Sequence, residues 1–153
     1  MNNMKKGLTL IEILISISLM VILVGVYFMV ANPAGQLASS RNTKRTLDLQ
    51  TIMNYIQQNT ADSQTGQFVC ASGPLPTSSE FMASAGTNTY NIEPCLITYG
   101  ASALPFDPSA SSSHYNSVSN YNTGYKIVIS STSSVITLTA PYAELGKTIT
   151  YSH

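Results

Sequence analysis

Apolar positions divide the chain into an N-terminal segment and a more polar remainder. Residues 8–31 form an apolar run of 24 residues (31 − 8 + 1) in which Glu12 is the only charged side chain. As a helix, this run would extend about 36 Å at 1.5 Å per residue, more than the roughly 30 Å of a hydrocarbon core. The pattern therefore predicts a membrane-spanning helix over residues 8–31.

A second helical pattern occupies residues 32–60. Four apolar residues recur there at the spacing i, i+3, i+4 and i+7: Leu49, Ile52, Met53 and Ile56. This spacing places them on one face of an amphipathic helix, which needs a partner to pack against. On the opposite face we expect Arg45 and Asp48 to pair at i, i+3. Pro33 lacks an N–H and clashes with the preceding turn, so it predicts a helix kink.

From residue 61 to 153 the pattern changes to short strands separated by turns. The predicted strands are 66–70, 94–100, 124–130, 134–140 and an edge strand at 147–151. Residues 131–134 fit a hairpin connection, and residues 104–124 form a loop rich in Ser, Asn and Tyr. The expected fold is α+β, with the long N-terminal helix leaning on a small antiparallel sheet.

Composition fits a protein displayed outside the cytosol. The formal net charge is +0, and only 9% of residues are charged, against roughly 25% in an ordinary soluble domain. Nothing in this balance indicates nucleic acid or an acidic partner. The two cysteines, Cys70 and Cys95, could close a disulfide in an oxidising compartment, because their flanks both resemble strand ends. Two reduced thiols are the alternative.

Glu12 needs an explanation, because a carboxylate inside a membrane is unfavourable. A secretory signal peptide would have a shorter apolar run. A plain membrane anchor leaves the acid unexplained. Cleavage between Gly7 and Leu8 would instead create an α-amine on Leu8, which is mostly cationic at neutral pH. That amine could pair with Glu12 of a neighbouring copy, so that each charge relieves the other.

The N-terminal residues resemble a known leader. Lys5, Lys6 and Gly7, followed by the sequence Leu-Thr-Leu-Ile-Glu at 8–12, resemble the class III leader of type IV pilins and type II secretion pseudopilins. The resemblance implies that a prepilin peptidase cuts after Gly7 and methylates the amine of Leu8. The resemblance is good over roughly residues 5–60, which includes the second helical pattern, and is loose beyond residue 60.

The resemblance also implies domains and a function. The chain would comprise a leader (1–7), a membrane and filament-core helix (8–31), an amphipathic continuation (32–60) and a β-rich globular region (61–153). It would be a structural subunit of a type IV pilus or pilus-like filament, held in the inner membrane by a single span before assembly and displayed on the cell surface afterwards. Its partners would be copies of itself, the prepilin peptidase, the assembly platform with its ATPase, and membrane lipid. A type II secretion pseudopilin and a non-polymerising membrane-anchored surface protein are the alternatives.

Enzymatic chemistry is not indicated. The two histidines, His114 and His153, have no nucleophile or carboxylate pattern beside them, and we interpret them as surface residues. Asp107 and Glu93 each stand beside a proline and are interpreted as isolated turn formers. Asp107 is the only acid in residues 100–143, which argues against a calcium site. We expect no catalytic residues, metal or cofactor.

The tyrosines raise the question of nucleic-acid stacking. Three of them lie in or beside the predicted loop: Tyr115, Tyr121 and Tyr125. Binding of DNA normally needs a basic groove as well, and Lys126 stands alone there. We therefore expect no nucleic-acid partner.

Overall fold

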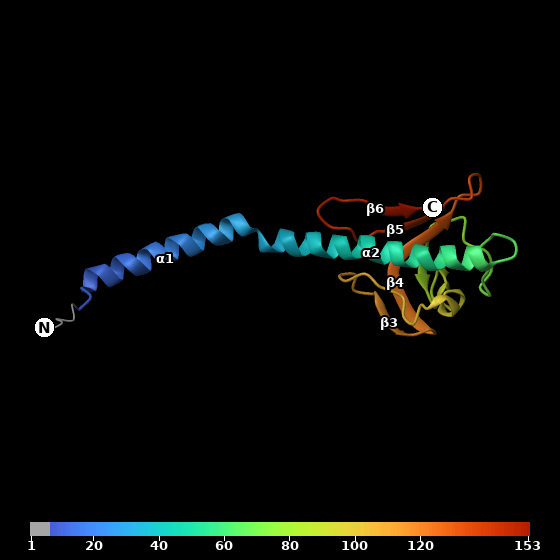
Figure 1. Cartoon of the computed structure of the whole chain (residues 1–153), viewed down its shortest axis with the longest axis horizontal. Coiled ribbons are helices and arrows are strands. Elements are labelled where there is room, and N and C mark those ends of the chain that lie inside the picture. Colours follow the sequence, from blue (N-terminus) through green and yellow to red (C-terminus); the bar gives the residue numbers. More distant parts are fainter. Residues whose placement is uncertain (1–6) are drawn as a thin grey trace, which may run out of the picture. The chain divides into compact units, whose positions relative to one another are not determined.

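The computed structural model describes residues 7–153 (Figure 1). It contains two compact units, one ending at Leu37 and the other comprising Ala38–His153. The expected α+β layout is confirmed, because a long apolar N-terminal helix is followed by a helix that packs with a β-sheet.

The N-terminal unit is dominated by α1 (Leu10–Ala31), which matches the predicted apolar helix. Every residue from Gly7 to Val30 is exposed. The helix ends at Asn32, which adopts a left-handed backbone with φ of 34°. Pro33 then takes the first position of α2 (Pro33–Asp62), where its fixed φ suits a helix start and its missing N–H costs nothing.

In the globular unit, α2 contributes the predicted apolar stripe. Leu49, Ile52 and Met53 are fully buried and Ile56 is 1% exposed. These four residues join strand residues such as Ile127 in one hydrophobic core. The periodicity of the sequence is therefore confirmed as the face that packs on the sheet.

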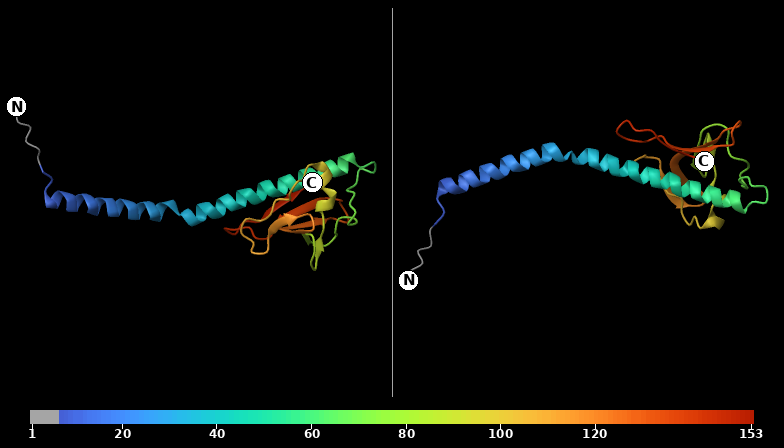
Figure 2. Two further views of the ribbon diagram at one scale, coloured as in Figure 1. Left: turned by 90° about the horizontal axis from the view of Figure 1, so that it is seen from below. Right: turned by 45° about the horizontal axis from the view of Figure 1, so that its top comes forward.

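The sheet has six strands: β1 (Glu80–Ala83), β2 (Thr89–Tyr90), β3 (His114–Ser117), β4 (Asn120–Ile129), β5 (Ile136–Ala140) and β6 (Ile149–Ser152). The strand order is β2-β1-β4-β5-β6, with β3 also paired to β4. The predicted hairpin of β4 and β5 and the edge strand β6 are present (Figure 2). The sheet is not purely antiparallel, however, because β1 and β2 pair in parallel.

Two predicted strands are wrong. Residues 68–70 have no regular structure, and residues 94–100 fall in two 3-10 turns, η1 (Glu93–Cys95) and η2 (Ile97–Tyr99). Pro94 explains the second error, because proline fits the first turn of a helix and cannot donate to a sheet. Conversely, β3 and the start of β4 lie in the predicted loop 104–124, where polar residues pair across a hairpin.

Candidate functional site

The predicted cleavage site lies in exposed backbone without regular structure, just before α1. Gly7, Leu8 and Thr9 precede the helix and are exposed, and a Cβ added at Gly7 would meet nothing within 4 Å. The Gly7–Leu8 bond therefore lies in irregular backbone of the kind that proteases reach most easily. The basic leader residues Lys5 and Lys6 lie outside the described residues.

Thr9 caps the helix, a role that the sequence reasoning missed. Its backbone is extended, and its Oγ1 accepts a hydrogen bond from the backbone N–H of Glu12 over 3.4 Å. The signal was present in the sequence, because a Thr followed three residues later by Glu is the spacing of a capping box. Thr9 therefore fixes α1 to begin immediately after the predicted cleavage site.

Glu12 lies in the first turn of α1, where a negative charge interacts favourably with the helix dipole. Its side chain is exposed, as are those of its apolar neighbours. No Lys or Arg occurs between Gly7 and Ala31. A cationic partner for Glu12 must therefore come from another part of the chain, from a newly made amine, or from another molecule.

Comparison with known proteins identifies this segment. Residues 2–28 match the family described as the prokaryotic N-terminal methylation motif. The segment is the class III leader of type IV pilins and pseudopilins. No curated protein and no solved structure matches the chain. The motif thus supports a pilin-like prepilin. Proteins of the pilin type that carry this motif are structural rather than catalytic.

The prepilin motif is followed by a helix suited to a bilayer. Within residues 7–153, one helical segment is long and apolar enough to cross a membrane, and it lies near the N-terminus. Together the motif and this helix fit a membrane-anchored precursor.

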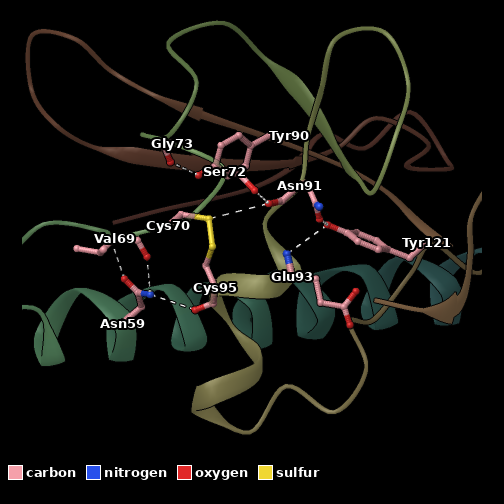
Figure 3. The surroundings of a disulfide bond; sticks show 10 residues. All are labelled: Asn59, Val69, Cys70, Ser72, Gly73, Tyr90, Asn91, Glu93, Cys95 and Tyr121. Carbon is pink, nitrogen blue, oxygen red and sulfur yellow. Dashed lines mark hydrogen bonds between the residues drawn. A yellow bond between two sulfur atoms is a disulfide. The ribbon is translucent and has the colours of Figure 1, made fainter. Parts of the chain in front are cut away.

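The globular unit, Ala38–His153, contains the expected disulfide, between Cys70 and Cys95 (Figure 3). Asn59, at the end of α2, bridges the two segments that carry the cysteines. Its Nδ2 donates to the carbonyl oxygens of Val69 and Cys95, each over 3.0 Å, and its Oδ1 accepts from the N–H of Val69 over 2.9 Å. The disulfide therefore joins two segments that the same amide already aligns.

Arg45 does not pair with Asp48, so that prediction is wrong. Arg45 is fully buried and donates from Nε and Nη2 to the two carboxylate oxygens of Asp107, over 2.7 and 3.1 Å. Asp48 instead accepts from Lys44 over 2.6 Å and from the hydroxyl of Tyr125 over 2.7 Å. Arg45 precedes Leu49 by one turn and so lies on the buried side of α2, where it meets Asp107, whereas Lys44 and Tyr125 bind the carboxylate of Asp48.

Asp107 is therefore not an isolated turn former. Its Oδ1 accepts hydrogen bonds from the backbone N–H groups of Ser109 and Ala110, which shapes the turn. The same carboxylate also accepts the two hydrogen bonds from Arg45. Burial alone would raise the pKa of Asp107. The hydrogen bonds from Arg45 and the two N–H groups outweigh burial and hold the pKa below its ordinary 3.8.

A second acid, Glu144, is held to α2 by three side chains, an arrangement that we call the Glu144 clamp. Arg41 donates to both carboxylate oxygens, and Arg45 adds a bond of 2.9 Å. Asn42 binds the backbone of Glu144, with its Nδ2 donating to the carbonyl and its Oδ1 accepting from the N–H. The hydrogen bonds from Arg41 and Arg45 lower the pKa of Glu144 to about 2.

Glu93 is also more than a turn former. It is fully buried, and its Oε1 accepts a hydrogen bond from the hydroxyl of Tyr115. Its Oε2 has no hydrogen-bond partner among the described residues. Burial raises the pKa of Glu93 above its ordinary 4.5, and the Tyr115 bond opposes this only in part. The buried carboxyl group therefore holds a proton more tightly than an exposed glutamate does.

The tyrosines of the predicted loop are placed differently from the prediction. Tyr121 and Tyr125 are buried in β4, at 2% and 0% exposure. They contribute to the core and cannot serve as stacking surfaces.

Over residues 7–153, no group of three or more His, Cys, Asp or Glu side chains is placed to hold a metal ion.

Proposed function

We propose that this prepilin-like chain is a structural subunit of a type IV pilus or a related filament. In this proposal the peptidase cuts after Gly7 and methylates the new amine of Leu8. Before assembly, α1 anchors the mature chain in the inner membrane. The chain is then extracted into a helical polymer on the cell surface. An assembly platform and its ATPase would supply the work of extraction.

One observation carries the proposal. Glu12 is the single charged side chain in an exposed apolar helix, five positions after the predicted cleavage site, inside a matched methylation motif. A lone carboxylate in lipid is unfavourable, and so is a lone ammonium. Pairing Glu12 of one copy with the Leu8 amine of the next relieves both, and it sets how far each subunit enters the filament.

The exposure of α1 supports the same conclusion. Among residues 7–153, nothing buries its apolar side chains from Leu10 to Val30, which are all exposed. Lipid can cover them before assembly, and α1 helices of other copies can cover them afterwards. Transfer from membrane to filament core then exposes no large apolar surface to water, and repeated addition is a heterologous contact that does not close.

The test replaces Glu12 in the native cell. Glu12→Ala and the uncharged isostere Glu12→Gln should both abolish surface filaments recovered by shearing, while the subunit remains in the membrane fraction. Ser16→Ala is the matched control, because Ser16 lies one turn further along α1 and bonds only to the carbonyl of Glu12.

Two results would contradict the proposal. Unchanged filament yield from Glu12→Gln would show that the charge sets no register. Absence of filaments from the unmodified chain in its native cell would favour a non-polymerising membrane anchor.

A further inference from the structure

The helix α1 carries four polar side chains in an otherwise apolar sequence: Glu12, Ser16, Ser18 and Tyr27. The two serines are satisfied inside the helix, because each Oγ donates to the carbonyl oxygen one turn earlier over 2.7 Å. The hydroxyl of Tyr27 stands at the end of a rigid ring and cannot fold back onto its own helix in this way. Tyr27 therefore needs a polar partner outside α1, as Glu12 does.

Tyr27 lies near the end of α1 that joins α2, which we call the outer end, and it is 67% exposed. The last turn of α1 contains no basic residue, and the next Lys or Arg in the sequence is Arg41. Lysine and arginine therefore supply no anchor at the outer end of the apolar helix. Tyrosine is enriched at the interface between membrane and water, where its ring contacts acyl chains and its hydroxyl meets polar groups.

The residue at which α1 ends agrees with an interfacial position for Tyr27. Asn32 lies five residues beyond Tyr27, which is about 8 Å along a helix axis. The polar headgroup layer on each side of the hydrocarbon core is about 5–8 Å thick. With Tyr27 at the boundary of the hydrocarbon core, Asn32 and the polar residues of α2 therefore begin where the headgroup layer meets water.

The other end of the apolar segment fits the same placement. For a helix along the bilayer normal, the 17 steps from Leu10 to Tyr27 cover about 26 Å of a hydrocarbon core of about 30 Å. Leu8 and Thr9 precede the helix and supply the few remaining ångströms. The α-amine predicted on Leu8 and the hydroxyl of Tyr27 therefore reach the two boundaries of the core together.

The position of Tyr27 fixes the depth of Glu12. The two residues are 15 positions apart, about 22 Å along the axis, so Glu12 lies about 8 Å inside the opposite boundary of the hydrocarbon core. Centring the whole apolar run 8–31 in the core would instead leave Glu12 about 4 Å from that boundary and would bury Tyr27 by a similar distance. A carboxylate deeper in the hydrocarbon has less access to water and depends more on a cationic partner.

We propose that Tyr27 binds the polar interface of the bilayer at the outer end of α1, and that this contact keeps Glu12 inside the hydrocarbon layer. The partner of Tyr27 is the lipid surface, whose ester and phosphate oxygens accept a hydrogen bond from its hydroxyl. The inference rests on the membrane stage of the proposed function. It adds a reason why the Glu12 carboxylate stays away from water until the amine of another copy arrives.

Tryptophan fluorescence in vesicles measures the depth of α1. The chain contains no tryptophan, so a single introduced one reports its own depth. Ile17→Trp and Val21→Trp place this reporter at two exposed positions one turn apart on the same face of α1. Full-length protein is reconstituted into phosphatidylcholine vesicles, and quenching by lipids brominated at different depths gives the distance of each reporter from the bilayer centre. With Tyr27 at the outer boundary, the Ile17→Trp reporter should lie about 6 Å closer to the centre than the Val21→Trp reporter.

Removal of the hydroxyl tests whether Tyr27 is the anchor. Tyr27→Leu, introduced into both reporter chains, should let α1 shift by about 4 Å toward the cytoplasmic side. The two reporters should then differ by less than about 2 Å in their distance from the centre. Phe28→Leu is the matched control, because it removes a neighbouring ring of similar exposure that carries no hydroxyl. This control should leave the difference of about 6 Å unchanged.

Three results would overturn the inference and leave the proposed function intact. One is a Val21→Trp reporter that lies closer to the centre than the Ile17→Trp reporter in the chain with Tyr27. Another is a difference between the reporters that Tyr27→Leu does not change. The third is an equal shift from Phe28→Leu and Tyr27→Leu. Water-like emission from both reporters would instead contradict the membrane stage of the proposed function itself.

Discussion

Arg45 and Asp107 form a two-bond ion pair in the interior of the globular unit, and both side chains have zero exposure. The pair joins α2 to the segment after Pro105 and Phe106, 62 residues away in sequence. Because both charges have left water, each depends on the other and on its neighbouring polar groups. The pair therefore fixes where the polar loop before β3 attaches to the helix.

Removal of the Arg45 side chain from this ion pair should destabilise the folded chain. Arg45→Met leaves Asp107 buried without its cation, and we expect a loss of about 3–5 kcal/mol in the free energy of unfolding. Chemical denaturation of the detergent-solubilised chain, followed by near-UV circular dichroism, measures this loss. Arg41→Met is the control and should cost much less, because Arg41 is partly exposed. Combining Arg45→Met with Asp107→Asn should recover part of the loss, and failure to do so would show that the pairing is not what Arg45 contributes.

The disulfide should contribute substantially to stability. Cys70 and Cys95 are 25 residues apart, and closing a loop of that length removes about 3–4 kcal/mol of unfolded-state entropy. The Cys70→Ser, Cys95→Ser double variant should unfold at a correspondingly lower denaturant concentration. Reductant should destabilise the parent chain and leave the double variant unaffected. Equal stability of parent and variant would contradict this role.

Glu93 should make the folded chain less stable as the pH rises. Its folded pKa is raised above the ordinary 4.5, so the folded state holds the proton more tightly than the unfolded state. The resulting stability is fully present below about pH 4.5 and is lost as the pH rises through the folded pKa. Glu93→Gln, a neutral mimic of the protonated acid, should raise the thermal midpoint at pH 8 and change it little at pH 4.

Glu80→Gln, on the partly exposed start of β1, is the control for that experiment and should leave the pH profile of the parent unchanged. A Glu93→Gln chain that is less stable than the parent at pH 8 would show that the ionised carboxylate, rather than the neutral acid, belongs in the fold.

Local patterns in the sequence predicted the elements that local physics determines. The spacing of Leu49, Ile52, Met53 and Ile56 was sufficient to identify the buried face of α2, because a helix repeats every 3.6 residues. The strands β4 and β5 were found for a similar reason, since their apolar residues alternate or cluster between turn signals. The methylation motif could be recognised from the sequence because its residues are consecutive.

Contacts between distant segments could not be predicted in this way. The sequence shows the charge of Arg45 but not its partners, Asp107 and Glu144, which the fold brings from 62 and 99 residues away. Likewise, the hydrogen bond between Tyr115 and Glu93 joins residues that are 22 apart in sequence. The apolar run at 94–100 was mistaken for a strand, since hydrophobicity alone does not distinguish a buried strand from a buried turn that begins with proline.

The central claim is that Leu8 becomes a methylated N-terminus able to pair with Glu12 of another copy. The intact mass of the subunit, purified from its native cell, tests this claim most directly. The account predicts the mass of residues 8–153 plus one CH2, because the methyl group replaces a hydrogen of the amine, and minus the two hydrogens of the disulfide. A mass that still includes residues 1–7 would contradict it, because the amine that Glu12 requires would never have formed.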